Sequence, residues 1–186
     1  MRIVAGAWRG RALTAPSGGA TRPTADRVRQ ALFDMLLHAP WGGRDRITGA
    51  TVLDAFAGTG ALGLEALSRG AAKAHFIERD QAALAALRGN IARLRAVAAV
   101  HEGEATRPPR GVACGLVFLD PPYGQGLVEL ALAALGAAGW IAPGALVVAE
   151  TERREALAPW GEDRGGEVLA ERNHGMARIT VLRAPW

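Results

Sequence analysis

The chain has 186 residues, of which 49% are hydrophobic and 22% are charged, and this length and composition suit one domain with a substantial core. The hydrophobic fraction excludes a disordered chain, and no run approaches the roughly 18 consecutive apolar residues of a membrane-spanning helix. The N-terminus lacks an apolar stretch followed by a cleavage site, and the single cysteine, Cys114, cannot form an intrachain disulfide. We therefore expect a cytoplasmic protein with no membrane partner.

The net charge of +4 is concentrated at the N-terminus. Residues 1–30 contain six arginines and one acid, Asp26, so this segment carries +5 and the remainder −1. Arginine forks bind phosphates in bidentate fashion and stack on bases, so the clustering predicts contact with nucleic acid. The predicted nucleic-acid-facing residues are Arg2, Arg9, Arg11, Arg22, Thr24, Arg27 and Arg29.

The first 40 residues are expected to form an N-terminal hairpin and helix that extend from a core domain of residues 41–186. Residues 2–5 and 12–14 pair around a turn near Gly10, and the stretch from Ser17 to Gly19 is a flexible connector. Thr24 is expected to cap a helix that runs to about Leu37. One face of this helix is apolar and Arg27 and Arg29 lie off it; its apolar residues are Val28, Leu32, Met35 and Leu36.

From residue 51 onward, strand-like and helix-like segments alternate. This order predicts an α/β fold, a doubly wound and mostly parallel sheet closed by a C-terminal antiparallel strand pair. Ligands bind such sheets at the carboxyl ends of the strands. The expected strands are 51–56, 74–78, 97–101, 116–119, 145–150, 167–170 and 179–182, and the expected helices are 60–69, 81–94 and 127–138.

A glycine-rich loop follows the first of these strands. Gly58, Gly60 and Gly63 fit the G-x-G-x-x-G spacing between a strand and a helix, where glycines let the backbone turn tightly and approach a nucleotide-type cofactor. Glu78 ends the next strand, 18 residues after Gly60, where a carboxylate accepts hydrogen bonds from ribose hydroxyls. These residues fit NAD and S-adenosylmethionine equally well.

Two further positions bear on the identity of the cofactor. Asp54 stands four residues before Gly58, within Asp54-Ala55-Phe56-Ala57-Gly58, and a carboxylate there would repel a pyrophosphate. It favours a cationic ligand, such as a sulfonium that carries an α-ammonium group, and we place Phe56 in the same cofactor site. After the third strand, Glu104 and Ala105 lie where an acid could meet an adenine amino group, although Glu102 competes for that role.

The fourth strand of this region runs into Asp120-Pro121-Pro122-Tyr123. The prolines end the strand, and Pro121 still offers a carbonyl, so this turn presents acceptors beside the Asp120 carboxylate. Together they can hold both hydrogens of an –NH₂ group with its lone pair directed at a methyl donor, while Tyr123 stacks on an unstacked base. The four residues predict methylation of an exocyclic amino group by direct in-line transfer, with no metal.

On these residues the chain resembles the bacterial 16S ribosomal RNA guanine-N2 methyltransferase family that modifies guanine 966. The similarity spans nearly the whole length and rests on Met1–Arg11, Arg22–Phe33, Asp54–Arg69 and Asp120–Tyr123, of which the first two blocks are the most specific. Two departures are Gln30, where an acid is usual, and the segment 173–177, to which we assign no role.

The resemblance implies that the doubly wound sheet is a Rossmann-like class I methyltransferase core with an N-terminal extension facing the RNA. It implies S-adenosylmethionine as cofactor and a guanine of 16S ribosomal RNA as target, in a partly assembled small ribosomal subunit. It implies that Asp54, Gly58, Gly60 and Glu78 bind the cofactor and that Asp120 to Tyr123 hold the guanine. We expect a monomer. Three alternatives stay open: a DNA adenine-N6 or cytosine-N4 methyltransferase, an NAD-dependent oxidoreductase, and a non-catalytic RNA-binding assembly factor.

Overall fold

A computed structural model describes residues 1–15, 23–155, 157 and 166–185, with the side chains of residues 23–25 excepted. The predicted connector at Ser17–Gly19 and the predicted RNA contact Arg22 lie outside the described residues. Within the described part, no helix is long and apolar enough to cross a membrane.

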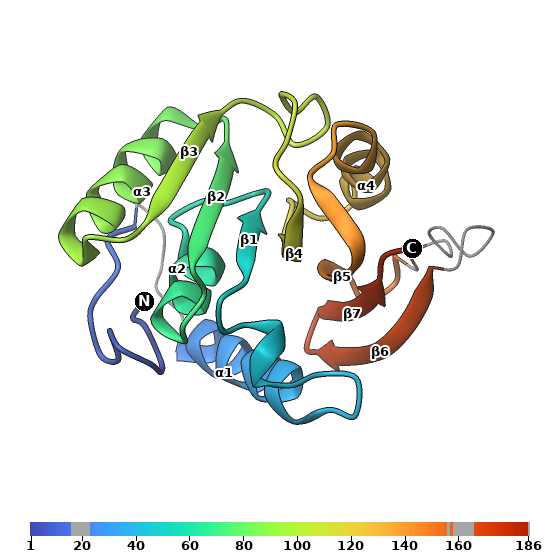
Figure 1. Ribbon diagram of the computed structural model, residues 1–186, viewed down its shortest axis with the longest axis horizontal. Helices are drawn as coiled ribbons and strands as arrows, with labels where there is room; N and C mark the ends of the chain where they lie inside the picture. Colours follow the sequence, from blue (N-terminus) through green and yellow to red (C-terminus); the bar gives the residue numbers. More distant parts are fainter. Residues whose placement is uncertain (16–22, 156, 158–165, 186) are drawn as a thin grey trace.

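The structure is built on a single seven-stranded sheet in the order β3-β2-β1-β4-β5-β7-β6 (Figure 1). The first five strands of that order pair in parallel, and β7 joins β5 and β6 in antiparallel fashion. The predicted sheet type and its C-terminal antiparallel pair are confirmed. The strands are β1 (Thr51–Asp54), β2 (Lys73–Glu78), β3 (Ala98–Glu102), β4 (Cys114–Leu119), β5 (Ile141–Glu152), β6 (Glu167–His174) and β7 (Ala177–Arg183).

Helices cover both faces of the sheet because successive strand residues point to opposite sides. On one face, Val52, Phe76 and Phe118 pack with apolar side chains of the first three helices. On the other face, Leu53 and Val117 pack with the fourth helix. The helices are α1 (Pro23–His38), α2 (Ala61–Ser68), α3 (Gln81–Leu94) and α4 (Leu127–Ala137), and a short 3₁₀ turn spans Arg44–Arg46.

The N-terminal arm, residues 1–15, is part of the main hydrophobic core. A single antiparallel bridge joins Arg2 to Ala12, so the predicted hairpin is present but minimal. Ile3 and Leu13 are buried in the same apolar cluster as Phe33 of α1. The arm runs beside α2 and α3 in Figure 1. Residues 1–40 are therefore an extension whose apolar side chains share the core of the sheet.

Several predicted boundaries differ from those observed, and three of the differences have a clear physical reason. The α1 helix begins at Pro23, so Thr24 lies within its first turn and is not its cap; proline suits a first helical turn because the missing N–H would have no partner there. The first strand ends at Asp54 and not at residue 56, because the glycine loop begins there. The fifth strand is longer than expected, Ile141–Glu152, since it pairs with both β4 and β7.

Candidate active site

A cavity of about 810 Å³ lies at the carboxyl ends of β1, β2 and β4. In a doubly wound sheet this is the edge where ligands bind, and β1 lies at the point where the strand order reverses. The predicted cofactor residues Phe56, Gly58, Glu78, Glu104 and Ala105 all line it, together with the whole segment from Asp120 to Tyr123. Two motifs far apart in the sequence therefore share one cavity.

The three loop glycines have different roles. Gly58, at a φ of 53°, has open space where a Cβ would be, so its bare backbone faces the cavity. A Cβ on Gly60, at a φ of 81°, would lie 2.5 Å from Cδ1 of Leu87, and one on Gly63 would lie 2.4 Å from Cε1 of Phe76. Gly58 thus permits close approach of a ligand, whereas Gly60 and Gly63 permit close packing of the loop and α2 on β2 and α3.

Glu78 organises the loops around the cavity. One carboxylate oxygen accepts the Gly58 N–H at 2.7 Å, and the other accepts the N–H groups of Arg79 and Asp80 at 2.7 and 2.8 Å. Asp80 in turn caps α3 by accepting the Ala83 N–H at 2.8 Å. A carboxylate held by three backbone N–H groups is fixed in place where a ribose could donate hydrogen bonds to it.

Asp54 lies beneath the cavity and does not line it, and the same is true of Gly60. The Asp54 side chain is buried and accepts the Gly63 N–H at 2.9 Å. Burial raises its pKa to about 7; the Gly63 hydrogen bond opposes this rise and the nearby Glu78 carboxylate adds to it. Sequence reasoning placed Asp54 directly against a ligand, whereas the structure shows it supporting the glycine loop from below.

The third strand leads to Glu104, which lines the cavity, and to Glu102, which does not. Glu102 instead accepts hydrogen bonds from Gln81 at 2.6 Å and Arg88 at 3.2 Å, both on α3. Glu104 is paired with Arg79 at 3.1 Å and is still half-exposed. Of the two acids that competed for the adenine, only Glu104 faces the cavity.

Asp120 and Tyr123 meet a carboxylate that the sequence did not single out. Asp120 is open to the cavity but enclosed by protein on its other sides, so loss of hydration raises its pKa well above the usual range, and the Glu150 and Asp54 carboxylates raise it further. The Tyr123 hydroxyl donates a short hydrogen bond to Glu150 at the end of β5. Burial and that bond also raise the pKa of Tyr123. The Tyr123 ring, 43% exposed, is therefore held at the cavity by its hydroxyl.

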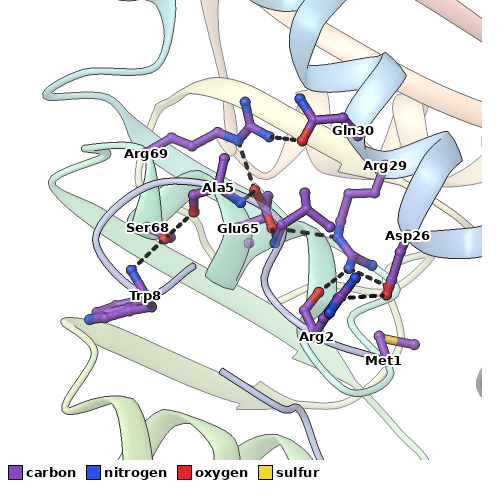
Figure 2. Close-up of polar contacts among 12 residues, drawn as sticks. Met1, Arg2, Ala5, Trp8, Asp26, Arg29, Gln30, Glu65, Ser68 and Arg69 are labelled. Atoms are coloured by element: carbon purple, nitrogen blue, oxygen red, sulfur yellow. Dashed lines mark hydrogen bonds and ion pairs between the residues drawn. The ribbon is translucent and has the colours of Figure 1, made fainter. Parts of the chain in front are cut away.

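The predicted RNA contact Arg29 is wrong, because the side chain is buried in an ionic cluster (Figure 2). Its guanidinium donates to Asp26 at 2.8 Å and to the Arg2 carbonyl, and lies 3.6 Å from Glu65. Glu65, on α2, also pairs with Arg69 at 2.8 Å. Arg29 therefore fastens α1 to the arm and to α2.

Glu65 is the centre of this cluster and is fully buried. Besides the two arginines, its carboxylate accepts the backbone N–H groups of Val4 at 2.8 Å and Ala5 at 3.0 Å. Ser68, one turn later, accepts the Trp8 N–H and donates to the Ala5 carbonyl (Figure 2). Sequence reasoning missed Glu65 because its partners come from α1 and the arm, although an acid inside an apolar helical stretch is a signal that could have revealed it.

Of the other predicted RNA contacts, some are exposed and the rest lie outside the described parts of the structure. Arg2, Arg9, Arg11 and Arg27 are exposed, and Arg2 lies 3.9 Å from Asp26. The Thr24 side chain and the whole of Arg22 are not among the parts described. Gln30, one of the departures from the family pattern, accepts a hydrogen bond from Arg69 at 3.2 Å, so an acid at that position would pair with the same arginine.

The histidines that looked scattered in the sequence are partly brought together. His75 and His101 stack with ring centroids 5.4 Å apart, and both lie edge-on to Trp140. They are packed in the structure away from the cavity lining. Among the described residues, no group of three or more His, Cys, Asp or Glu side chains could hold a metal ion.

The chain is similar to known proteins over most of its length. A family model described as Conserved hypothetical protein 95 matches residues 1–183. A relative from Escherichia coli strain K12, named Ribosomal RNA small subunit methyltransferase D, is 44% identical over 160 residues, which are 84% of this chain and 77% of the relative. A solved structure of a putative methyltransferase from Escherichia coli covers 100% of this chain and 98% of its own, at 38% identity and a TM-score of 0.84.

A solved structure with lower sequence identity shares the fold of this chain. The 16S rRNA N2 G1207 methyltransferase of Thermus thermophilus, solved with AdoMet and guanosine, covers 90% of this chain and 44% of its own, with a TM-score of 0.66. At 21% identity this similarity establishes a shared class I methyltransferase fold and nothing finer.

Proposed function

Since this chain belongs to the Conserved hypothetical protein 95 family, together with the ribosomal RNA small subunit methyltransferase D proteins, we propose that it transfers a methyl group from S-adenosylmethionine to the N2 amino group of a guanine in 16S ribosomal RNA, at the position numbered 966 in that family. The observation that carries this proposal is the single cavity shared by the glycine loop and the Asp120–Tyr123 segment. A donor site and an acceptor site for the methyl group lie in one space.

The cofactor half of the cavity fits S-adenosylmethionine by the chemistry of its donors. Gly58 lets a ligand approach the backbone, and the fixed Glu78 carboxylate can accept ribose hydroxyl hydrogens. Glu104 lines the wall where an adenine amino group could donate to it. The many carboxylates near the cavity favour a cationic ligand over a pyrophosphate, which argues against NAD. When bound, S-adenosylmethionine supplies an activated methyl on a positively charged sulfur.

The acceptor half holds and orients the amino group. Asp120 and the Pro121 carbonyl can each accept one amino hydrogen, and Tyr123 offers a ring face for the base. Held in this way, the nitrogen directs its lone pair at the methyl carbon, which it would not do while conjugated into the ring. The new N–C bond forms as the C–S bond breaks, with the bonding pair returning to sulfur. The nitrogen then loses one proton, which Asp120 can accept and pass to water.

A labelling experiment tests this function. The protein is incubated with S-adenosylmethionine carrying a labelled methyl group and with small subunits that lack the modification, and the RNA is then digested to nucleosides. We expect the label in N2-methylguanosine. Label in an adenine or cytosine nucleoside would instead support a base-amino methyltransferase of different specificity. No label from a preparation that binds cofactor would support a non-catalytic assembly factor.

The form of the substrate is part of the proposal. We propose that a monomer acts on a partly assembled small subunit, where the target base is already folded but still accessible. Three substrates distinguish the possibilities in the same assay: free 16S ribosomal RNA, subunits depleted of late-binding proteins, and mature subunits. The depleted subunits should be methylated fastest, and equal rates on all three would contradict this part of the proposal.

A further inference from the structure

Glu150 is a carboxylate beside the predicted base-binding site to which no role has been given. Parallel strands β4 and β5 pair through Leu119 and Ala149, so Asp120 and Glu150 are the next residues on neighbouring strands. Adjacent strands lie about 4.8 Å apart, which places both carboxyl groups at the same end of the sheet. The Glu150 carboxylate is close enough to raise the pKa of Asp120.

The Tyr123 hydroxyl fixes where Glu150 lies relative to a stacked base. That hydroxyl donates to Oε1 of Glu150, so the carboxylate sits at the tip of the ring. A base stacked on the ring would have one edge over that tip. Glu150 is half-buried beside Tyr123 and is not itself among the cavity-lining residues. Its Oε2 has no hydrogen-bond or ion-pair partner in the described part of the chain, so it can accept from a base edge that reaches past the Tyr123 ring.

The charged groups that influence the Tyr123 hydroxyl are all acceptors: Glu150, Asp120 and Glu152. The three bases with amino groups differ in what stands next to that group on the Watson–Crick edge. In guanine the neighbour of the N2 amino group is N1–H, a donor. In adenine and cytosine the ring nitrogen beside the amino group is an acceptor, which would face a carboxylate without a hydrogen between them.

We propose that Glu150 selects guanine: its free carboxylate oxygen accepts the N1–H while Asp120 and the Pro121 carbonyl hold the adjacent N2 amino group. This inference rests on the proposed function and names the residue that gives the site its base specificity. A site whose acceptor pairs with a hydrogen-bond donor of the substrate rejects analogues that lack that donor, because the acceptor of the protein is then left without a partner. Adenine and cytosine would be excluded by the same group that binds guanine.

The test uses 2-aminopurine, which keeps the 2-amino group but has an acceptor at position 1. The labelled RNA is first cut into fragments to locate the nucleotide that carries the label. That guanosine is then replaced by 2-aminopurine riboside in a ligated 16S ribosomal RNA. The wild type should methylate guanine on the order of 10²-fold or more faster than 2-aminopurine. Glu150→Gln should reduce that ratio to within about tenfold, since the amide can donate to the ring nitrogen. An unchanged ratio in Glu150→Gln would overturn the inference.

Two control variants separate base recognition from simple positioning of the tyrosine. Tyr123→Phe keeps the ring and the Glu150 carboxylate but removes the bond between them, so it should slow turnover while it keeps the guanine preference. If Tyr123→Phe lost that preference as fully as Glu150→Gln, Glu150 would act only through the tyrosine, and the inference would be wrong. Glu171→Gln, at a surface carboxylate 3.8 Å from Arg178, should leave the ratio unchanged.

A binding measurement and the wild-type control distinguish failure of the proposed function from failure of the role of Glu150. The fluorescence of 2-aminopurine is quenched when it stacks on a ring, so entry into the site is measured without turnover. Glu150→Gln should bind the 2-aminopurine RNA more tightly than the wild type does. If the wild type labels no guanine at all, the proposed function has failed. If it labels guanine while Glu150→Gln keeps full discrimination and gains no affinity, only the role of Glu150 has failed.

Discussion

Asp54 and Asp120 are carboxyl groups placed where ionisation is costly. Asp54 is buried under the glycine loop, and Asp120 is enclosed by protein on all sides except the cavity. A neighbouring carboxylate also raises each pKa: Glu78 raises that of Asp54, and Glu150 raises that of Asp120. A cationic cofactor in the cavity would favour both ionised forms, so an arrangement that is unfavourable in the free protein favours binding of the methyl donor.

Replacing Asp120 separates its role from cofactor binding. Asp120→Ala removes an acceptor for the amino group but no contact predicted for the cofactor, so transfer should fall by about 10³-fold, with cofactor affinity nearly unchanged. Asp120→Asn, which keeps one acceptor oxygen, should retain more activity than the alanine variant. Single-turnover rates and calorimetric titration of cofactor measure the two effects. Equal losses of binding and turnover would show that Asp120 belongs to the cofactor site.

Asp54 should make the protein less stable as the pH rises. Its pKa of about 7 in the folded protein exceeds that of an unfolded aspartate, so the folded state binds more protons between about pH 4 and 7. Stability therefore falls through that window, by at most about 4 kcal/mol, and the full cost is present above pH 7.

Asp54→Asn tests this, because the amide oxygen can still accept the Gly63 N–H while the charge is absent. The variant should melt at nearly the wild-type temperature at pH 4 and at a higher one at pH 8, with roughly 2–4 °C for each kcal/mol recovered. The exposed control Asp45→Asn should show no such change with pH. A difference that is the same at both pH values would refute a buried, costly charge at Asp54.

At the scale of elements, α2 joins the cofactor loop to the N-terminal arm. It begins directly after Gly60, and its Glu65 and Ser68 hold the arm through residues 4–8. A second connection comes from α3, where the Asn90 amide donates to the carbonyls of both Thr14 in the arm and Thr59 in the loop, each at 3.0 Å. A movement of the arm would therefore reach the cofactor loop through two helices.

Glu65→Gln should be strongly destabilising, because among the described residues it leaves buried Arg69 without a carboxylate partner and buried Arg29 with Asp26 alone. Loss of one partner from a buried ion pair costs about 3–5 kcal/mol, so the melting temperature should drop by roughly 10 °C. The amide hydrogens of Val4 and Ala5 should also exchange faster. Glu102→Gln breaks only exposed contacts and should leave the melting temperature nearly unchanged. Similar losses in the two variants would contradict a structural centre at Glu65.

Features encoded locally were predictable from the sequence, and features that depend on distant partners were not. The alternation of strands and helices, the glycine loop and the Asp120–Tyr123 turn follow from short patterns, each set by a single strand, helix or turn. Arg29 was misjudged because a helical face shows only that it lies off the apolar side of α1, while its partner Glu65 is 36 residues away. Glu150 was overlooked because its place beside Tyr123 depends on the pairing of β4 with β5.

At the scale of the whole molecule, Arg29 is buried, so other arginines must supply the positive charge on the surface. The arm and α1 still expose Arg2, Arg9, Arg11 and Arg27, but Arg2 is near Asp26. The cavity itself is surrounded by carboxylates, which would repel RNA phosphates while accepting a base and a cationic cofactor. We therefore expect the exposed arginines outside the cavity to bind phosphates and the acidic site to bind the base.

The triple variant Arg9→Gln, Arg11→Gln, Arg27→Gln tests that division. Removing one arginine–phosphate ion pair should reduce the slope of log affinity against log salt by about 0.7–0.9, so the triple variant should bind RNA more weakly with a slope flatter by about 2. Filter binding between about 50 and 200 mM salt measures the slope. Arg110→Gln, at an exposed arginine in the loop before β4, should leave it unchanged. If the triple variant keeps the wild-type slope and cofactor affinity, these arginines do not contact the RNA backbone, and the surface that binds it lies elsewhere on the protein.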